Sequence, residues 1–335
     1  GSHLVQAAIE LEKDWAQVAR DITEQINQII YGYYKKEGVV VGLSGGIDSS
    51  VTAALCVHAL GKDKVLGVIL PEKESDKDSA PFALELAEYL GIEYVQQDIT
   101  DAITKFGSYE AITNIIKSKF EHYDDSYKYK ITLPGNLAKK QILNLYSLVV
   151  ENSEGQEVLK KKLSLRDYHA IQAALSVKLR VRMIYLYFYA ERHNKAVAGT
   201  TNRSEYDLGN FCKYGDGGVD FEVISHLYKT QVYGLAEFLG IPMEIRTRAP
   251  SPDTCSAFVT DEEFFFSLPF NILDQLLYAY DNDLSHHLVA NMLQMQSEQV
   301  AAIYANFKNK QLNTRKLKKL PPTCVDIADT RLMFR

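Results

Sequence analysis

Residues 38–50 read Gly-Val-Val-Val-Gly-Leu-Ser-Gly-Gly-Ile-Asp-Ser-Ser. A short β-branched run between glycines is typical of a buried strand, so 38–43 is predicted to be a strand of a sheet covered on both faces. Beyond the Gly-Gly turn, apolar residues recur at helical spacing and predict a helix over 49–60. A buried strand, a glycine-rich turn and a helix in this order indicate an α/β fold.

The same alternation continues along the chain, and it predicts a doubly wound parallel sheet with right-handed crossovers and flanking helices, a Rossmann-like fold. Helical spacing of apolar residues also predicts an N-terminal helix over about 4–37. The whole chain, 1–335, is expected to form a single α/β domain. The further strands are expected at 65–70, 94–99 and 196–200, and the further helices at 78–90, 171–193 and 228–239.

Residues 105–167 interrupt the alternation, because they are rich in Lys, Glu and Tyr and show weak periodicity. They are predicted to be an insertion between the third strand and the long helix, helical at both ends and mobile in the middle. Two interpretations stay open for this insertion: it forms a lid or a partner surface, or it is a solvated excursion that only decorates the surface.

Composition narrows the class of protein. The chain has 37 Lys+Arg against 43 Asp+Glu, a net charge of −6, which gives no reason to expect nucleic acid as a partner. Its longest apolar stretch, 183–190, is far shorter than the roughly 20 residues that span a bilayer, so no membrane association is expected. The four cysteines form no C-x-x-C pair, which favours a reducing compartment and a soluble, cytoplasmic protein. The run 185–189 is expected to lie in the core.

The turn after the first strand is a candidate ligand site, because ligands of open α/β sheets bind at the carboxyl ends of the strands. Gly45 and Gly46 let the backbone approach a ligand closely. The loop N–H groups and the helix N-terminus then converge on an anion, and Ser44 and Ser49 add hydroxyl donors. A purely structural β–α turn is the alternative for a Gly-Gly pair.

Asp48 is unusual in an anion site, because a carboxylate repels phosphate unless a cation bridges the two. The residue therefore implies Mg²⁺, which binds hard oxygen ligands together with phosphate. The loop is not a Walker loop, because it lacks the Gly-Lys-Ser/Thr ending.

The string Ser-Gly-Gly-x-Asp-Ser after a buried strand resembles the PP-loop of the N-type ATP pyrophosphatases. Those enzymes have an adenine-nucleotide α-hydrolase-like fold and cleave ATP between the α and β phosphates. Four further blocks follow, and each alone has a structural explanation such as a tight turn or a surface charge. In this order and spacing, and together with the PP-loop, the blocks resemble the NH3-dependent NAD synthetases. The resemblance covers about 38–101 and 176–252 and runs more loosely through the C-terminal region. The blocks are 199–205, 213–220, 227–232 and 249–253.

The resemblance implies a role for each matching residue. ATP, the co-substrate, is bound by residues of the loop and of three later blocks, Mg²⁺ is held by two carboxylates, and the acceptor is bound by two basic residues and one acidic residue. Asp48 and Lys229 are the implied catalytic residues. The implied ligands are Gly42, Ser44, Gly45, Gly46, Ser49, Thr200, Lys229 and Ser251 for ATP, Asp48 and Glu205 for Mg²⁺, and Arg180, Lys213 and Asp220 for the acceptor.

The resemblance also implies a reaction, the ATP-dependent amidation of nicotinic acid adenine dinucleotide (deamido-NAD) to NAD. The carboxylate is first adenylated, and AMP and pyrophosphate are released. No glutaminase domain is expected, so the nitrogen comes from free ammonia or from a separate ammonia-supplying protein. A homodimer is expected.

The chain departs from the family pattern at Ser176, where an asparagine is usual, in the 254–259 loop, in the basic tail 315–319 and in the length of the insertion. The departures concern the acceptor more than ATP. The alternatives are a PP-loop amide ligase acting on a different carboxylate and a non-catalytic adenine-nucleotide-binding relative. Sulfur transfer to RNA is disfavoured by the lack of a cysteine pair and of a basic domain.

Overall fold

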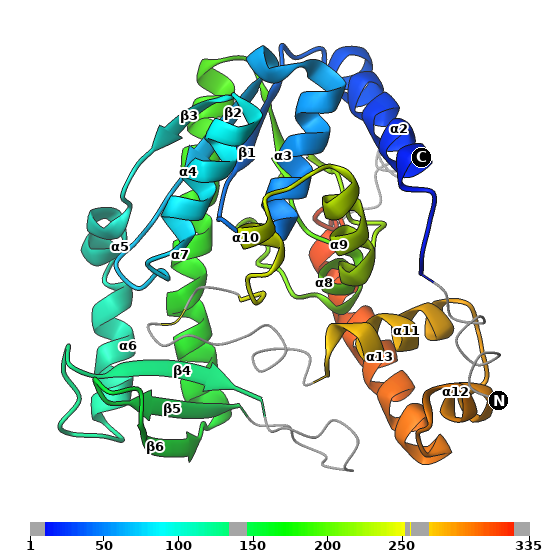
Figure 1. Cartoon of the computed structure of the whole chain (residues 1–335). Helices are drawn as coiled ribbons and strands as arrows, with labels where there is room; N and C mark the ends of the chain where they lie inside the picture. The colour runs from blue at the N-terminus through cyan, green and yellow to red at the C-terminus, as the bar shows by residue number, and fades with distance from the viewer. Residues whose placement is uncertain (1–10, 134–145, 252–254, 256–267, 325–335) are drawn as a thin grey trace.

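The computed structural model describes residues 11–133, 146–251, 255 and 268–324. Its centre is a five-stranded parallel sheet in the order β3-β2-β1-β7-β8, of which Figure 1 labels β1, β2 and β3. This order confirms the predicted doubly wound fold, and the switch point lies between β1 and β7, where chain connections leave in opposite directions. The strands are β1 (Val39–Gly42), β2 (Val65–Ile69), β3 (Glu93–Gln96), β7 (Ala196–Gly199) and β8 (Phe221–Glu222).

The central strand β1 is buried on both faces, as its unbroken apolar run predicts. Val39 and Val41 face a core that includes residues of helices α2, α3, α4 and α9. Val40 points to the other face, where α5 and α7 cover the sheet. The helices near the sheet are α2 (Trp15–Asn27), α3 (Ile47–Leu60), α4 (Ser79–Leu90), α5 (Thr100–Phe106), α6 (Ser108–Lys117), α7 (Leu165–Arg192), α8 (Arg203–Leu208), α9 (Lys229–Phe238) and α10 (Met243–Arg246).

The N-terminal helix is shorter than predicted. Residues 11–14 are not helical, and α2 begins at Trp15 because the Asp14 side chain accepts a hydrogen bond from the backbone N–H of Gln17. A π-helix, η2 (Gln28–Tyr34), follows and ends at Lys35, which has a left-handed backbone with φ of 54°. Residues 4–10 of the predicted helix lie outside the described residues.

The insertion differs from its prediction. After α6 it forms a three-stranded antiparallel sheet of β4 (Lys128–Thr132), β5 (Ser147–Glu151) and β6 (Glu157–Lys162), where a mobile middle was expected. This sheet lies at one end of α7, away from the parallel sheet (Figure 1). Its buried face packs with residues of α6 and α7, and Cys255 joins the same core. Residues 134–145 of the insertion lie outside the described residues.

The long helix α7 starts six residues before its predicted position, since Ser164 caps it by accepting a hydrogen bond from the Asp167 N–H. The run 185–189, expected in the core, is only partly buried, and its Phe188 is 55% exposed. The expectation holds in part: Tyr185, Leu186, Tyr187 and Tyr189 pack against the core beneath α7, whereas Phe188 does not.

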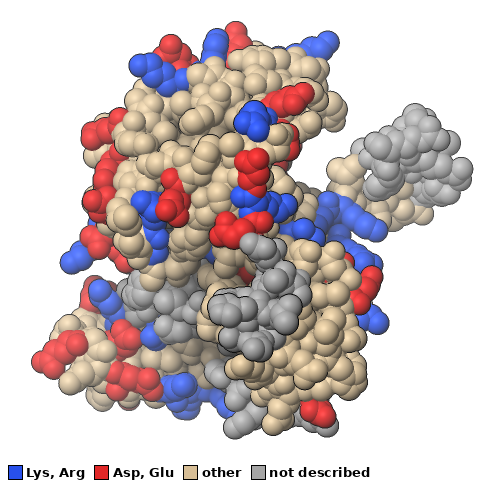
Figure 2. Space-filling model, turned by 45° about the vertical axis from the view of Figure 1, so that its right-hand side comes forward, with Lys and Arg blue, Asp and Glu red and all other residues tan. Residues whose placement is uncertain are grey.

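The C-terminal region forms a separate small core of helices beside α8 (Figure 1). Its helices pack around Leu273, Leu277 and Phe307. Acidic and basic side chains are interspersed over the face drawn in Figure 2. Within the described ranges, no helix is both long and apolar enough to cross a membrane. The elements are α11 (Phe270–Asp281), α12 (His286–Leu293) and α13 (Ser297–Lys318).

Candidate active site

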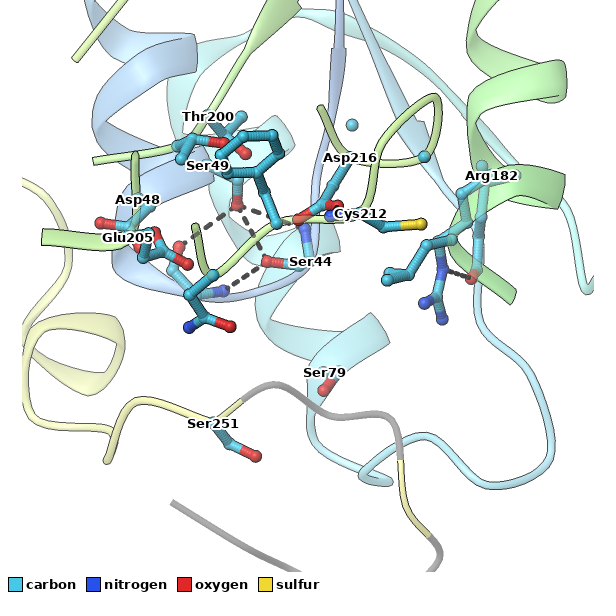
Figure 3. A pocket seen from close by; sticks show the side chains of 18 of the residues that line it. Ser44, Asp48, Ser49, Ser79, Arg182, Thr200, Glu205, Cys212, Asp216 and Ser251 are labelled. Carbon is cyan, nitrogen blue, oxygen red and sulfur yellow. Dashed lines mark hydrogen bonds between the residues drawn. The ribbon is translucent and has the colours of Figure 1, made fainter. Parts of the chain in front are cut away.

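The loop between β1 and α3 is held in shape by its own serines (Figure 3). The Ser44 and Ser49 hydroxyls lie 3.2 Å apart, and the Ser44 N–H donates to Ser49 Oγ at 3.2 Å. The Gly46 N–H donates to Ser44 Oγ at 3.2 Å. The loop therefore presents its hydroxyls and N–H groups at the start of α3, which suits an anion.

Gly45 cannot be replaced without distortion. Its φ is +78°, and a Cβ at this position would collide with the carbonyl oxygen of Ser79, the first residue of α4. The glycine therefore lets the loop and α4 approach each other closely.

A cavity of about 480 Å³ opens at the switch point, a volume typical of small-molecule sites. It is bounded by the β1–α3 loop, by the ends of β2 and β7, by one face of α7 and by the segment that follows α10. Nine of the predicted site residues line it: Gly42, Ser44, Gly46, Asp48, Ser49, Thr200, Glu205, Lys229 and Ser251.

The implied catalytic pair is in contact within this cavity. Lys229 Nζ lies 2.7 Å from Asp48 Oδ2. Asn202 lies between the two predicted carboxylates, because its side-chain amide donates to Asp48 at 3.3 Å and its backbone N–H donates to Glu205 Oε1 at 3.3 Å. Asp48 of α3, Lys229 of α9, and Asn202 and Glu205 at the start of α8 thus form one connected polar group. Figure 3 shows the two carboxylates.

Lys229 is almost fully buried, with 3% of the residue exposed. It is the first residue of α9, and its backbone N–H donates to Ser204 Oγ at 3.1 Å. Asp274, buried on α11, accepts hydrogen bonds from Ser204 Oγ at 2.6 Å and from the Thr230 N–H at 2.8 Å. Burial raises the pKa of the Asp274 carboxyl. Helix α11 therefore fixes the start of the helix that carries the lysine.

The two carboxylates fit a magnesium ion. Asp48 and Glu205 both line the cavity, and Mg²⁺ typically binds one or two carboxylates together with phosphate oxygens and water. The described part of the chain contains no group of three or more His, Cys, Asp or Glu arranged for a metal. Two carboxylates would leave the other coordination positions to phosphate oxygens and water, so they suit an ion that arrives with a nucleotide.

The predicted acceptor residues do not line this cavity. Arg180 Nε donates to the Lys213 carbonyl at 3.2 Å, so these two residues are neighbours. The Asp220 carboxylate accepts hydrogen bonds from the Val197 N–H at 2.7 Å and from the Tyr187 hydroxyl at 3.1 Å. Gly45, a predicted ATP ligand, also lies outside the lining, and its backbone approaches Ser79 of α4 closely.

Three site features escaped the sequence predictions. Asn202 had a signal, since an Asn three residues before a Glu is a capping box, and the structure has one. Asp274 had no local signal, because its partners are distant in sequence. The third feature is an aromatic pair at the far end of the cavity: Tyr146 of the insertion stacks on Tyr168 of α7, with ring centroids 4.5 Å apart.

The departures from the family pattern are partly located. Ser176 lines the cavity beside Cys212, and burial raises the pKa of the Cys212 thiol, which disfavours a thiolate nucleophile. From the 254–259 loop the structure describes only Cys255. At the basic tail, Lys318 Nζ lies 3.7 Å above the ring of Tyr206 on α8.

A parallel sheet with an anion loop at its switch point, and a buried lysine paired with a carboxylate there, defines an α/β nucleotide-binding enzyme of the PP-loop type. The model of the NAD synthase family matches residues 18–122 and 123–317. The chain belongs to this family.

Known relatives agree with this assignment. The chain is 40% identical over 314 residues to the NH(3)-dependent NAD(+) synthetase of Mesorhizobium japonicum, covering 94% of this chain and 98% of that protein. It is 41% identical over 283 residues to the Rhizobium meliloti enzyme of the same name, covering 84% of each.

Two solved structures share the fold. NMN synthetase from Francisella tularensis has a TM-score of 0.63 at 24% identity and covers 93% of this chain and 99% of its own. NH3-dependent NAD synthetase from Campylobacter jejuni, solved with a nitrate ion, has a TM-score of 0.61 at 22% identity, covering 94% and 100%.

Proposed function

We propose that this chain catalyses the ATP-dependent amidation of deamido-NAD to NAD with ammonia as nitrogen donor, releasing AMP and pyrophosphate. The observation that carries the proposal is the meeting of the Ser44–Ser49 loop, Asp48, Glu205 and Lys229 in one cavity of an NAD synthase family member. Relatives about 40% identical over most of the chain are NH3-dependent NAD synthetases.

The residues support adenylation by positioning and charge. A carboxylate oxygen of the acceptor attacks the α-phosphorus of ATP, and the bond to the pyrophosphate oxygen breaks. The Ser44 and Ser49 hydroxyls and the N-terminus of α3 hold the leaving pyrophosphate, while Lys229 places a positive charge where negative charge builds up. Ammonia then attacks the acyl carbon, loses a proton and displaces AMP. No side chain acts as a covalent nucleophile.

Asp48 and Glu205 would hold Mg²⁺ in this scheme. When bound, the ion supplies charge compensation for the phosphates. Lys229 exchanges its present contact with Asp48 for the phosphates when ATP enters. Thr200 and Ser251 line the rest of the nucleotide space.

Acceptor identity is tested by measuring pyrophosphate release with ammonium and a panel of carboxylates. The panel includes deamido-NAD, the corresponding mononucleotide and free nicotinic acid. We expect deamido-NAD to be preferred, and stoichiometric AMP to accompany the amide. Preference for the mononucleotide, the acceptor expected of an NMN synthetase, would keep the adenylation mechanism and refute the proposed product.

Arg180→Ala is expected to raise KM for the acceptor carboxylate by about 10-fold or more and to change kcat little, because an interaction that stabilises the ground state and the transition state equally acts on KM alone. Steady-state kinetics with acceptor as the varied substrate measure this. Arg166→Ala, an exposed arginine in the first turn of the same helix, is the matched control and should leave both constants unchanged. An unchanged KM in Arg180→Ala would remove Arg180 from the acceptor site.

We also propose a homodimer. Ile184 and Phe188 lie four residues apart on α7 and are 60% and 55% exposed, which leaves an apolar stripe that a second copy of the same helix would cover. Light scattering at micromolar concentration should give twice the chain mass of 37.8 kDa. Phe188→Glu should give the monomer mass, whereas Phe238→Glu, which alters a similarly exposed phenylalanine on α9, should not. A wild-type mass of one chain would contradict the proposal.

The remaining partner predictions stay predictions. A separate ammonia-supplying protein, a cytoplasmic location and the absence of nucleic-acid and membrane partners rest on the sequence. Turnover with free ammonium as sole nitrogen source in the assay above would show that the reaction itself does not require such a protein.

A further inference from the structure

A buried lysine that the mechanism does not use lies next to the nucleotide cavity. Lys178, on α7, has no exposed side-chain surface. Its Nζ lies 3.3 Å from Glu72 Oε1 and 2.9 Å from Glu74 Oε1. Both carboxylates belong to the irregular segment 70–75 that follows β2, here called the β2 loop.

Two tyrosines complete the cluster from different parts of the chain. The Tyr109 hydroxyl, on α6, donates to Glu72 Oε2, and the Tyr129 hydroxyl, on β4 of the insertion, donates to Glu74 Oε1 at 3.2 Å. Burial, together with the neighbouring carboxylates, raises the pKa of both phenols, so they remain donors. The cluster therefore joins α7, two elements of the insertion (α6 and β4) and the β2 loop.

The β2 loop forms part of the cavity wall. Leu70, Pro71 and Ser75 line the same cavity as the Ser44–Ser49 loop. Arg182, one turn beyond Lys178 on α7, donates from Nε to the Leu70 carbonyl at 3.2 Å. The loop has no regular secondary structure beyond a turn, in which the Ser75 N–H donates to the Glu72 carbonyl at 2.9 Å. Its contacts with α7 and the insertion hold this turn against the rest of the protein.

Such a cluster is not needed for stability alone. Desolvation of the buried Lys178 and Glu72 and of the partly buried Glu74 offsets much of their attraction, and apolar side chains of the same volume often stabilise a core as well. What an ion pair adds is a defined geometry, since a lysine amine sets where two carboxylates lie. Removing the lysine alone leaves the two carboxylates facing each other without a counter-charge.

We propose that Lys178 is a positioning residue for ATP: it holds the β2 loop in the shape that lines the nucleotide cavity and, through Glu74 and Tyr129, ties that wall to the insertion. This inference rests on the proposed function in one respect, that ATP occupies this cavity. It gives the insertion a role, since Tyr129 of its three-stranded sheet contacts the β2 loop.

The test measures binding of α,β-methylene ATP, which cannot be cleaved between the α and β phosphates, by calorimetry with Mg²⁺. Lys178→Met is expected to raise Kd about tenfold and KM for ATP equally, with kcat at saturating ATP and KM for the acceptor within about twofold of wild type. Tyr129→Phe removes one hydroxyl at unchanged volume and is expected to raise Kd about threefold.

Lys119→Met is the matched control. Lys119 pairs with Asp167 at 2.6 Å and so also joins the insertion to α7, but neither residue lines the cavity. This variant should leave Kd unchanged. A lowered melting temperature with unchanged Kd in Lys178→Met would make the lysine merely structural and overturn the proposal.

Where Lys178→Met does not fold, Tyr129→Phe and Glu74→Gln decide the matter, because an unchanged Kd in both would overturn the proposal equally. Failure of the proposed function would show in the wild-type protein, not in these variants. A wild-type protein that does not bind the ATP analogue would refute ATP occupancy itself. A wild type that binds it but does not amidate deamido-NAD would refute the product and leave the comparison of Kd values valid.

Discussion

Asp48→Asn is expected to lower turnover by about 10²–10³-fold and to leave the fold intact. The amide keeps the size of the side chain but removes a negative charge that pairs with Lys229 at 2.7 Å and that would bind Mg²⁺. ATP can still bind through the serines of the loop, but the departing pyrophosphate is deprived of charge compensation.

The measurement is kcat at saturating ATP, acceptor and Mg²⁺, with circular dichroism to verify the fold. The control is Asp63→Asn, which alters an exposed aspartate shortly after α3, the helix that carries Asp48. This variant should behave as wild type. Retention of more than about a third of wild-type turnover would contradict the assignment of Asp48 to the metal.

Lys229→Ala is expected to lower kcat by about 10²–10³-fold with a smaller change in KM, because its charge matters most as pyrophosphate leaves. The buried ammonium lies against the rings of Tyr233 and Phe270, 5.9 and 5.7 Å from their centroids. A water molecule in the place of the ammonium would therefore stabilise the leaving pyrophosphate poorly. The backbone hydrogen bond of residue 229 to Ser204 survives the substitution, so α9 should still form.

Single-turnover kinetics separate the chemical step from binding in this variant. The double variant with Asp48→Asn is informative, because two residues in contact that act on one leaving group should give effects that do not add. Lys308→Ala, at an exposed position of α13, is the control. A Lys229→Ala enzyme with a raised KM for ATP and normal kcat would make the lysine a binding residue only.

The parallel sheet was predictable because its signals are local. The run at β1 is apolar on both faces, and the Gly-Gly turn and the first turn of α3 follow it directly, so the strand, the anion loop and Asp48 could be placed without tertiary information. Glu205 and Lys229 came from the family resemblance, and the structure brings both to the same cavity.

The insertion was harder, although β4 carries a signal. Tyr129 and Ile131 point inward and alternate with Lys128 and Lys130, but the strand is five residues long and its inward tyrosine belongs to a tract of polar residues. A short strand needs partners to be recognised, and those partners, β5 and β6, lie further along the chain. Asp274 and Lys178 owe their roles to contacts distant in sequence, which no local pattern reveals.

The length of α7 has a consequence for how this protein can change. A single helix of 28 residues carries Tyr168 beside the insertion, Lys178 under the β2 loop, Met183 in the cavity and Phe188 on the outer surface. Each residue added to or removed from such a helix rotates everything beyond it by about 100°. One deletion between Tyr168 and Lys178 would therefore turn the lysine away from its carboxylates. Insertions and deletions should be tolerated at the ends of α7 and in the loops of the insertion, while the interior of this helix can vary only by substitution.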